Sequence, residues 1–252
     1  MENKLDVLNW DAGKEHVYDA MGHEVPGKLL VRRKDTGSIM AVVSDRYQLV
    51  QHRAAVAPLI DKLGPNWYAH KVSLELDGAR AFIEMRNDLI QCEVKKGDII
   101  AARALIFNSI DGSSSVGTEF GALRLVCLNG MTRPTGPAFK LNARHTSGVM
   151  GQLNLIGDHY RDAWQTMLDS YRALTDRAVS VNVARDLIAA IMGKRATEEV
   201  LTLWQAGRGQ DGDLTAWALY NGATEYLTHR KDSAILGRER VNQAVLDALL
   251  GL

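Results

Sequence analysis

The sequence predicts an α+β fold, with an N-terminal antiparallel sheet and one packed helix, followed by a helical C-terminal third. Paired β-rich runs alternate with turn residues in the first part of the chain, and a single helical period at residues 52–63 interrupts them. From Val149 onward, apolar residues recur at steps of three and four. This change of period predicts a β-rich core at residues 1–147 and a helical region at 148–252.

Two hairpins are predicted within the β-rich core. Residues 29–33 and 39–43 are rich in β-formers and flank a short connection that contains glycine. Residues 67–76 and 79–86 flank an Asp-Gly dipeptide, which is a strong hairpin signal. The helix predicted at 52–63 therefore lies between the two hairpins along the chain.

Further elements follow from the same patterns. Residues 99–109 and 116–129 are strand candidates, although the end of the second run also fits a helix. One long amphipathic helix is predicted from Val149 to Leu174. Shorter helices are predicted at 183–192, 198–205, 215–228 and 241–250.

The composition is that of an ordinary soluble globular protein and excludes a bulk attraction to polyanions. The chain has 252 residues, with 30 basic and 30 acidic side chains. The N-terminal residues are polar and mixed in charge, and no apolar run approaches the roughly 20 residues that span a bilayer. Cys92 and Cys127 form no disulfide framework. We therefore expect a cytoplasmic protein with reduced cysteines and no membrane partner.

The sequence offers no recognisable catalytic or metal-binding motif. The 7 histidines lack metal-ligand spacing, and no phosphate-binding glycine loop is present. A serine in the turn at residues 111–115 would need a nearby base to act as a nucleophile. We therefore expect no enzyme activity, no cofactor and no metal. An enzyme with a dispersed site that uses Asp111, Ser113 or His145 is the least favoured alternative.

One long segment lacks acidic residues, because no Asp or Glu occurs between Glu119 and Asp158. Its central part contains several cations together with Gly130, Pro134 and Gly136, which favour an irregular, exposed connection. Such a loop would create a local positive potential that attracts phosphate. The alternative is a buried strand and a loop whose cations pair with acids from elsewhere in the chain.

The predicted nucleic-acid contacts fall into two groups. Within the acid-free segment they are Arg124, Arg133, Lys140, Arg144 and His145. Candidates for the same groove are Arg103, Lys95, Lys96 and Lys71. Stacking of bases on aromatic rings assists single-strand binding, and the candidates for stacking are Tyr47, Trp67, Tyr68 and His70. The aromatic residues at helical spacing in the C-terminal part are expected to serve packing.

Several segments resemble a phage and plasmid protein family described as a domain of unknown function. The matching stretches are VPGKLLVRRKDTGSIMAVVSDRYQLVQ at 25–51, NSIDGSSSV at 108–116, RLVCLNGM at 124–131, RHT at 144–146 and TAWALYNGATEYLTH at 215–229. The resemblance implies a mobile-element origin and a cytoplasmic setting, and it supplies no catalytic residue. The family also tends to carry a longer polar insertion before the last helix than this chain does.

The order of elements is also similar to that of the single-strand annealing recombinases of the Rad and Redβ types. That layout implies a ring or filament that holds single-stranded DNA in a basic groove. We therefore expect a non-catalytic, homo-oligomeric phage protein that anneals single-stranded DNA in recombination. The alternative is a protein-binding module that inhibits or modulates a host defence or replication factor.

Overall fold

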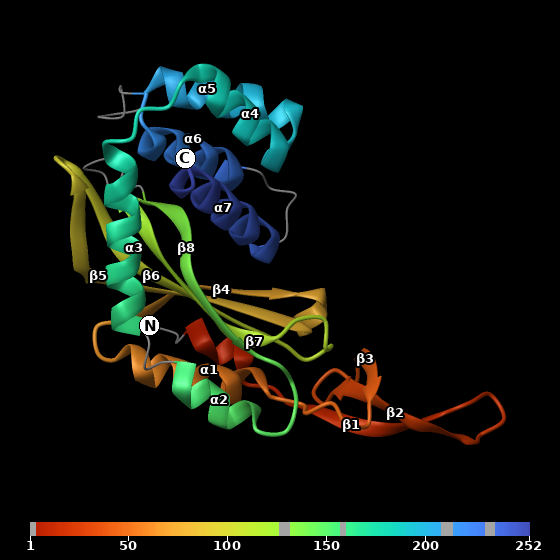
Figure 1. Cartoon of the computed structure of the whole chain (residues 1–252). Helices are drawn as coiled ribbons and strands as arrows, with labels where there is room; N and C mark the ends of the chain where they lie inside the picture. The colour runs from red at the N-terminus through yellow and green to blue at the C-terminus, as the bar shows by residue number, and fades with distance from the viewer. Residues whose placement is uncertain (1–3, 126–131, 157–159, 208–213, 230–234) are drawn as a thin grey trace. The chain divides into compact units, whose positions relative to one another are not determined.

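The computed structural model describes residues 4–125, 132–156, 160–207, 214–229 and 235–252. It confirms the predicted α+β class, with two sheets and helices mostly in the C-terminal part (Figure 1). The short N-terminal helix is η1 (Lys4–Leu8). The strands are β1 (Ala12–Tyr18), β2 (Glu24–Arg33), β3 (Ile39–Ser44), β4 (Tyr68–Glu75), β5 (Arg80–Lys95), β6 (Asp98–Ser109), β7 (Val116–Leu125) and β8 (Thr132–Ala143). The helices are α1 (His52–Leu63), η2 (Leu76–Gly78), α2 (Val149–Ile156), α3 (Tyr160–Thr175), α4 (Val181–Met192), α5 (Lys194–Ala206), α6 (Ala216–His229) and α7 (Ile235–Leu250).

The strands form two sheets, one of three strands in the order β1-β2-β3 and one of five in the order β4-β5-β6-β7-β8. The predicted hairpins are present, because β2 pairs with β3 and β4 pairs with β5, both antiparallel. Helix α1 occupies the predicted residues 52–63. Gly64 follows α1 with a φ of 83°, a backbone conformation in which glycine avoids steric strain.

Two predictions about local structure are wrong. Residues 132–143 form strand β8 where the glycines and prolines predicted an irregular connection. The reason is that β8 lies at one end of the strand order, and an edge strand tolerates proline because one side of its backbone has no partner. The predicted long helix from Val149 is two helices, since α2 ends at Ile156 and α3 begins at Tyr160.

The chain divides into two compact units that interleave along the sequence. Unit 1 comprises residues 1–87, 104–119 and 140–161, and unit 2 comprises 88–103, 120–139 and 162–252. Strands β5, β6, β7 and β8 therefore each contribute residues to both units. The predicted division into a β-rich core at 1–147 and a helical region at 148–252 stays a prediction.

Unit 2 is built around helices α3 to α7, of which α4, α5, α6 and α7 pack on one another (Figure 1). Its core contains three buried aromatic rings, with the centroid of Tyr171 at 5.0 Å from Trp217 and 5.8 Å from Tyr220. Their burial confirms that these aromatic residues serve packing. No helix among the described ranges is long and apolar enough to cross a membrane.

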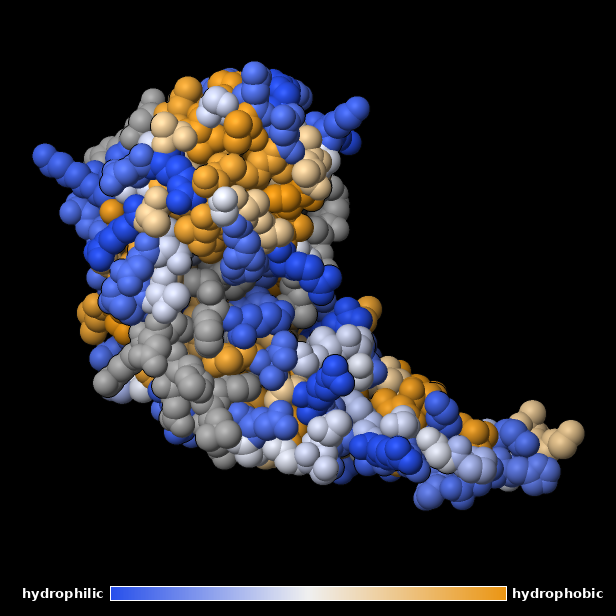
Figure 2. Space-filling model, viewed as in Figure 1, coloured by the Kyte–Doolittle hydropathy of each residue, from blue (hydrophilic) through white to orange (hydrophobic). Residues whose placement is uncertain are grey.

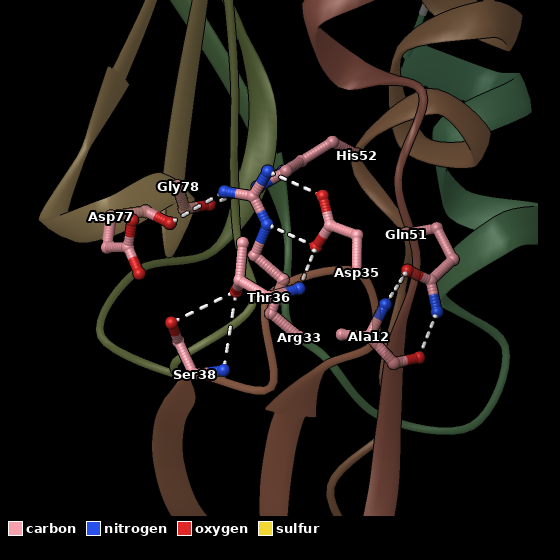
Figure 3. Close-up of polar contacts among 9 residues, drawn as sticks. All are labelled: Ala12, Arg33, Asp35, Thr36, Ser38, Gln51, His52, Asp77 and Gly78. Atoms are coloured by element: carbon pink, nitrogen blue, oxygen red, sulfur yellow. Dashed lines mark hydrogen bonds and ion pairs between the residues drawn. The ribbon is translucent and has the colours of Figure 1, made fainter.

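Unit 1 carries the three-stranded sheet, α1 and α2. One core cluster joins Ala12, Val31 and Val43 of the sheet to Ile110, which follows β6. The side-chain amide of Gln51 closes the start of β1, because it accepts from the Ala12 N–H at 2.9 Å and donates to the Ala12 carbonyl at 2.8 Å (Figure 3). Beyond the last pair with β3, residues 14–27 of the β1–β2 hairpin contain no buried residue.

The β4–β5 turn has an unusual backbone in which three consecutive residues have positive φ. The values are 52° at Leu76, 55° at Asp77 and 94° at Gly78. For residues with a side chain this left-handed conformation is strained, so it persists only where the surroundings enforce it. A Cβ at Gly78 would lie 2.8 Å from the Trp10 ring, so only glycine fits there.

Three separate segments hold the carbonyls of this turn, at residues 77–79. Arg33 donates to the first at 3.0 Å and His52 to the second at 2.7 Å, and the backbone N–H of Ile110 donates to the third at 2.7 Å. Arg33 is itself fixed by an ion pair with Asp35 at 2.7 Å (Figure 3). The turn therefore ties β2, α1 and the loop after β6 to the β4–β5 hairpin.

Candidate functional site

Two of the predicted nucleic-acid contacts are buried and hold internal carboxylates in unit 2. Arg124 contacts Asp98 at 2.7 Å, and the same carboxylate accepts a hydrogen bond from Trp217 at 2.6 Å. Arg103 contacts Glu239 at 3.0 Å, and both side chains are at most 6% exposed. Buried ion pairs of this kind are costly to separate. A phosphate could reach either guanidinium only by displacing its carboxylate.

Lys140 also has an internal partner, although its side chain is partly exposed. It forms a close ion pair with the buried Glu119, and its ammonium lies 4.9 Å from the centroid of the Phe107 ring. Glu119 is the last acidic residue before the acid-free segment. Its carboxylate therefore neutralises part of the positive charge of that segment. Lys140 is consequently a weaker candidate for a phosphate contact than a fully solvated lysine.

The other predicted cations divide between the units. Lys71 on β4 and Arg144 after β8 are exposed in unit 1, whereas Lys96 is exposed and Lys95 half-buried in unit 2. Arg133 lies in β8, but its side chain is outside the described part of the structure. Arg144 and His145, which are neighbours in the chain, lie at a different site, described next.

Three segments far apart in the sequence meet around His145. The backbone of Gln48 donates to the His145 carbonyl at 3.1 Å, and the His145 ring contacts the Gln48 carbonyl at 3.2 Å. The ring stacks on Tyr47 with a centroid distance of 5.1 Å and an interplanar angle of 26°. The hydroxyl of Tyr47 donates to the Ser109 carbonyl at 3.1 Å. We call the Tyr47–His145 stack and these contacts the stacked site.

The tautomer of His145 follows from its hydrogen bond. A carbonyl oxygen only accepts, so Nδ1 must carry the proton that points at Gln48. In the neutral ring Nε2 then presents a lone pair. This atom is buried and has no hydrogen-bond partner among the described residues. Burial lowers the pKa of His145, and the Gln48 contact and the nearby Asp111 oppose that effect.

The loop after β6 forms the second side of the stacked site. Asp111 accepts hydrogen bonds from the backbone of Ser113 at 2.9 Å and from its hydroxyl. Arg80 donates to the Ser113 hydroxyl at 2.7 Å and lies 3.5 Å from the Asp111 carboxylate. Burial, together with the negative charge of Asp111, raises the pKa of Tyr47. The tyrosine therefore stays a neutral hydrogen-bond donor.

A second buried histidine, His52, is close enough to His145 to interact with it electrostatically. Its Nε2 contacts the Gly78 carbonyl at 2.7 Å and must therefore be protonated. Its Nδ1 lies 3.0 Å from the Asn108 amide nitrogen, which also donates to the Val50 carbonyl at 3.1 Å. Nδ1 consequently accepts. Burial lowers the pKa of His52 to about 4, so the ring is neutral at pH 7.

Three exposed cations are linked to the stacked pair by a contact or by their place in the chain. Lys14 donates to the Tyr47 carbonyl at 3.1 Å, and its ammonium is exposed. Arg46 and Arg144 directly precede the two stacked residues, and both are exposed. We call Lys14, Arg46 and Arg144 the cationic rim. No group of three or more His, Cys, Asp or Glu within the described ranges could hold a metal ion.

Several of these residues were named from the sequence, but they were not predicted to lie in one site. Tyr47, Asp111, Ser113 and His145 were each singled out, whereas the roles of His52, Asn108, Gln48 and Arg80 were missed. The family resemblance could have indicated this site, because three of the stretches that carry it contain these residues or lie next to them. The structure shows that the stretches at 25–51, 108–116 and 144–146 converge in unit 1.

The protein is thus an α+β protein in which a histidine and a tyrosine stack next to the cationic rim. The model of a family described as a domain of unknown function, DUF932, matches residues 39–250. The chain belongs to this family, which confirms the resemblance at that level. A comparison with curated proteins gives no significant match, and neither does a comparison with solved structures.

Proposed function

We propose that the protein binds single-stranded nucleic acid through the stacked site and anneals complementary strands without a chemical step. The observation that carries this proposal is the exposed cationic rim beside the Tyr47–His145 stack. Cations neutralise phosphates, and this neutralisation supplies most of the free energy of sequence-independent binding to nucleic acid. The proposal includes a role in recombination of a phage or plasmid, in the cytoplasm of its host, as a ring or filament.

The proposed interface is narrower than the nine residues predicted from sequence. Arg103 and Arg124 are left out because each is buried against a carboxylate. Arg144 and His145 are retained, and Lys14 and Arg46 are added from the geometry. A ring would repeat this small cationic rim around its circumference, so that a protein of zero net charge could still follow a phosphate chain.

Binding of labelled single-stranded DNA over a series of salt concentrations tests the proposal. We expect affinity to fall steeply with salt in the wild type. The variant for comparison carries Lys14→Ala, Arg46→Ala and Arg144→Ala. In it the slope of the logarithm of the binding constant against the logarithm of the salt concentration should decrease in magnitude by about 2, since each single-strand phosphate contact contributes about 0.7. The matched control removes the exposed cations Lys194, Arg195 and Arg240 of unit 2 and should leave the slope unchanged.

Two results would contradict the proposal. One is the absence of binding at low salt, and the other is an equal change of slope in the rim variant and its control. A parallel assay of strand annealing, followed by energy transfer between two labelled complementary strands, tests the second half of the proposal. The wild type should accelerate pairing, and the rim variant should do so less.

A protein-binding module is the second candidate, and exposed apolar residues favour it. Tyr18 is 60% exposed and Met21 is 83% exposed, and both belong to the β1–β2 hairpin. Apolar residues are also visible on the face of the C-terminal helices drawn in Figure 2. Pull-down from a nuclease-treated host lysate separates the candidates, because a stoichiometric protein partner that is lost with Tyr18→Ser and Met21→Ser would support this one.

A further inference from the structure

His145 in the stacked site and Asn108 beside His52 each carry a buried acceptor that no described residue pairs. His145 is 8% exposed and Asn108 is 1% exposed. Neither His145 Nε2 nor Asn108 Oδ1 has a hydrogen-bond partner among the described residues. Buried polar atoms are nearly always paired, and leaving one unpaired costs free energy. The unpaired acceptor of His145, which lies where three segments converge, indicates a place for a group that donates a hydrogen bond.

The orientation of His145 fixes which kind of group can pair with it. Its Nδ1 proton is committed to Gln48 and its ring face to Tyr47, so Nε2 is the remaining polar atom of the side chain. In the neutral ring this atom accepts and cannot donate. A phosphate oxygen is also an acceptor and is therefore a poor partner. The complementary group is a neutral N–H or O–H donor.

Resting on the proposed function, we infer that His145 Nε2 accepts a hydrogen bond from a donor group of the bound strand. A strand offers two such donors, the amino group of a base and the 2′-hydroxyl of a ribose. The cationic rim holds the phosphates while His145 reads the donor. Thr146, Ser147 and Gly148, which follow His145 in the chain, are exposed.

Two substitutions separate the acceptor from the rest of the side chain. His145→Asn places an amide near the Nδ1 position, where it can still donate to Gln48, and leaves nothing at Nε2. His145→Gln reaches the Nε2 position and can turn its oxygen to the ligand. Thermal unfolding of both variants verifies that the fold is retained before binding is compared.

Three probes are used at a single low salt concentration: oligo(dA), oligo(rA) and an abasic deoxyribose-phosphate strand, which lacks both donors. We expect His145→Asn to weaken binding of a donor-bearing strand by about 5- to 10-fold, the effect of one lost hydrogen bond, and to leave the abasic strand unchanged. His145→Gln should stay within about twofold of the wild type, because it retains an acceptor.

The pattern of losses identifies the donor. A loss on oligo(rA) alone assigns the ribose hydroxyl, and a loss on both oligo(dA) and oligo(rA) assigns the base amino group. An equal loss on all three strands, or no loss on any, overturns the inference while leaving single-strand binding in place. If the wild type binds none of the strands, the proposed function itself has failed.

Discussion

At the scale of single residues, His52 links the folded state to pH. Its two ring nitrogens are committed to Gly78 and Asn108 in a pattern that only the neutral ring satisfies. Protonation would place a proton on Nδ1 in front of the Asn108 amide hydrogens. The fold therefore disfavours the charged ring, which agrees with the lowering of its pKa to about 4 by burial.

We expect the free energy of unfolding to decrease as the pH falls from about 6.5 to about 4. In that window the unfolded chain binds a proton at His52 and the folded chain does not, so acid favours unfolding. A pKa difference of this size corresponds to on the order of 3 kcal/mol. Urea unfolding of the wild type and of His52→Gln at pH 7 and at the acidic end of the window measures the effect.

His52→Gln should be less stable than the wild type at neutral pH, because its amide cannot reproduce both hydrogen bonds, and it should lose less stability in acid. The exposed His23 provides a control for the substitution itself, since His23→Gln at an exposed position should change the free energy of unfolding at pH 7 by no more than about 0.5 kcal/mol. Parallel losses in the wild type and in His52→Gln would show that other groups account for the acid sensitivity.

The types of the residues alone did not show which cations are buried and which are exposed to solvent. Arg124 was predicted as a phosphate contact because it lies in the acid-free segment, and Arg103 was predicted as a candidate for the same groove. Their carboxylates are 26 and 136 positions away in the sequence. Such pairs depend on strand register and helix packing, which a single sequence does not specify. The alternative of cations compensated from elsewhere was stated, and the structure favours it for these two residues.

At the scale of elements, β7 and β8 approach closely at Gly117. A Cβ on this residue would lie 2.2 Å from the Leu141 carbonyl and 2.8 Å from the Asn142 Cα. Backbone atoms in a strand cannot withdraw as a flexible side chain can. Glycine is therefore required here by the space between the strands.

We expect Gly117→Ala to lower the free energy of unfolding by about 2 kcal/mol or more, in the range of overpacked sites. Gly151 in α2 is the matched control, because a Cβ there meets nothing within 4 Å. Gly151→Ala should raise stability by about 0.5–1 kcal/mol through helix propensity. Thermal or urea unfolding compares the two, and equal effects would mean that β7 and β8 can separate at little cost.

The accuracy of the predicted elements follows from the strength of their local signals. Helix α1 and the hairpin strands were predicted well because period and turn residues act over a few positions. Strand β8 was missed because Pro134 and Pro137 exclude a central strand but permit an edge strand, and edge position depends on the whole sheet. Short strand β1 has an exposed, mixed-charge sequence that gave no signal.

At the scale of the whole molecule, the strand order leaves unpaired edges. The three-stranded sheet ends at β3, where Ile39 is 62% exposed and Val42 is 56% exposed. Exposed edges with apolar side chains favour association with another strand. A second copy is the partner that the proposed ring or filament requires.

We expect the protein to sediment as a species heavier than its monomer. Val42→Lys should shift the distribution toward the monomer, because a charge on an edge strand opposes pairing. Val183→Lys on α4, where the side chain is 42% exposed, adds the same charge outside the sheet and should leave the mass unchanged. A monomer at all concentrations would argue against a ring or filament, and then the cationic rim would act alone.

The triple anchoring of the β4–β5 turn has a consequence for shortened forms of the protein. The family match begins at residue 39, so a polypeptide trimmed to it keeps His52 and Ile110 but loses Trp10 and Arg33. Removing the β1–β2 hairpin would therefore weaken the packing around the β4–β5 turn. The hydrogen bonds from His52 and Ile110 would still hold the turn.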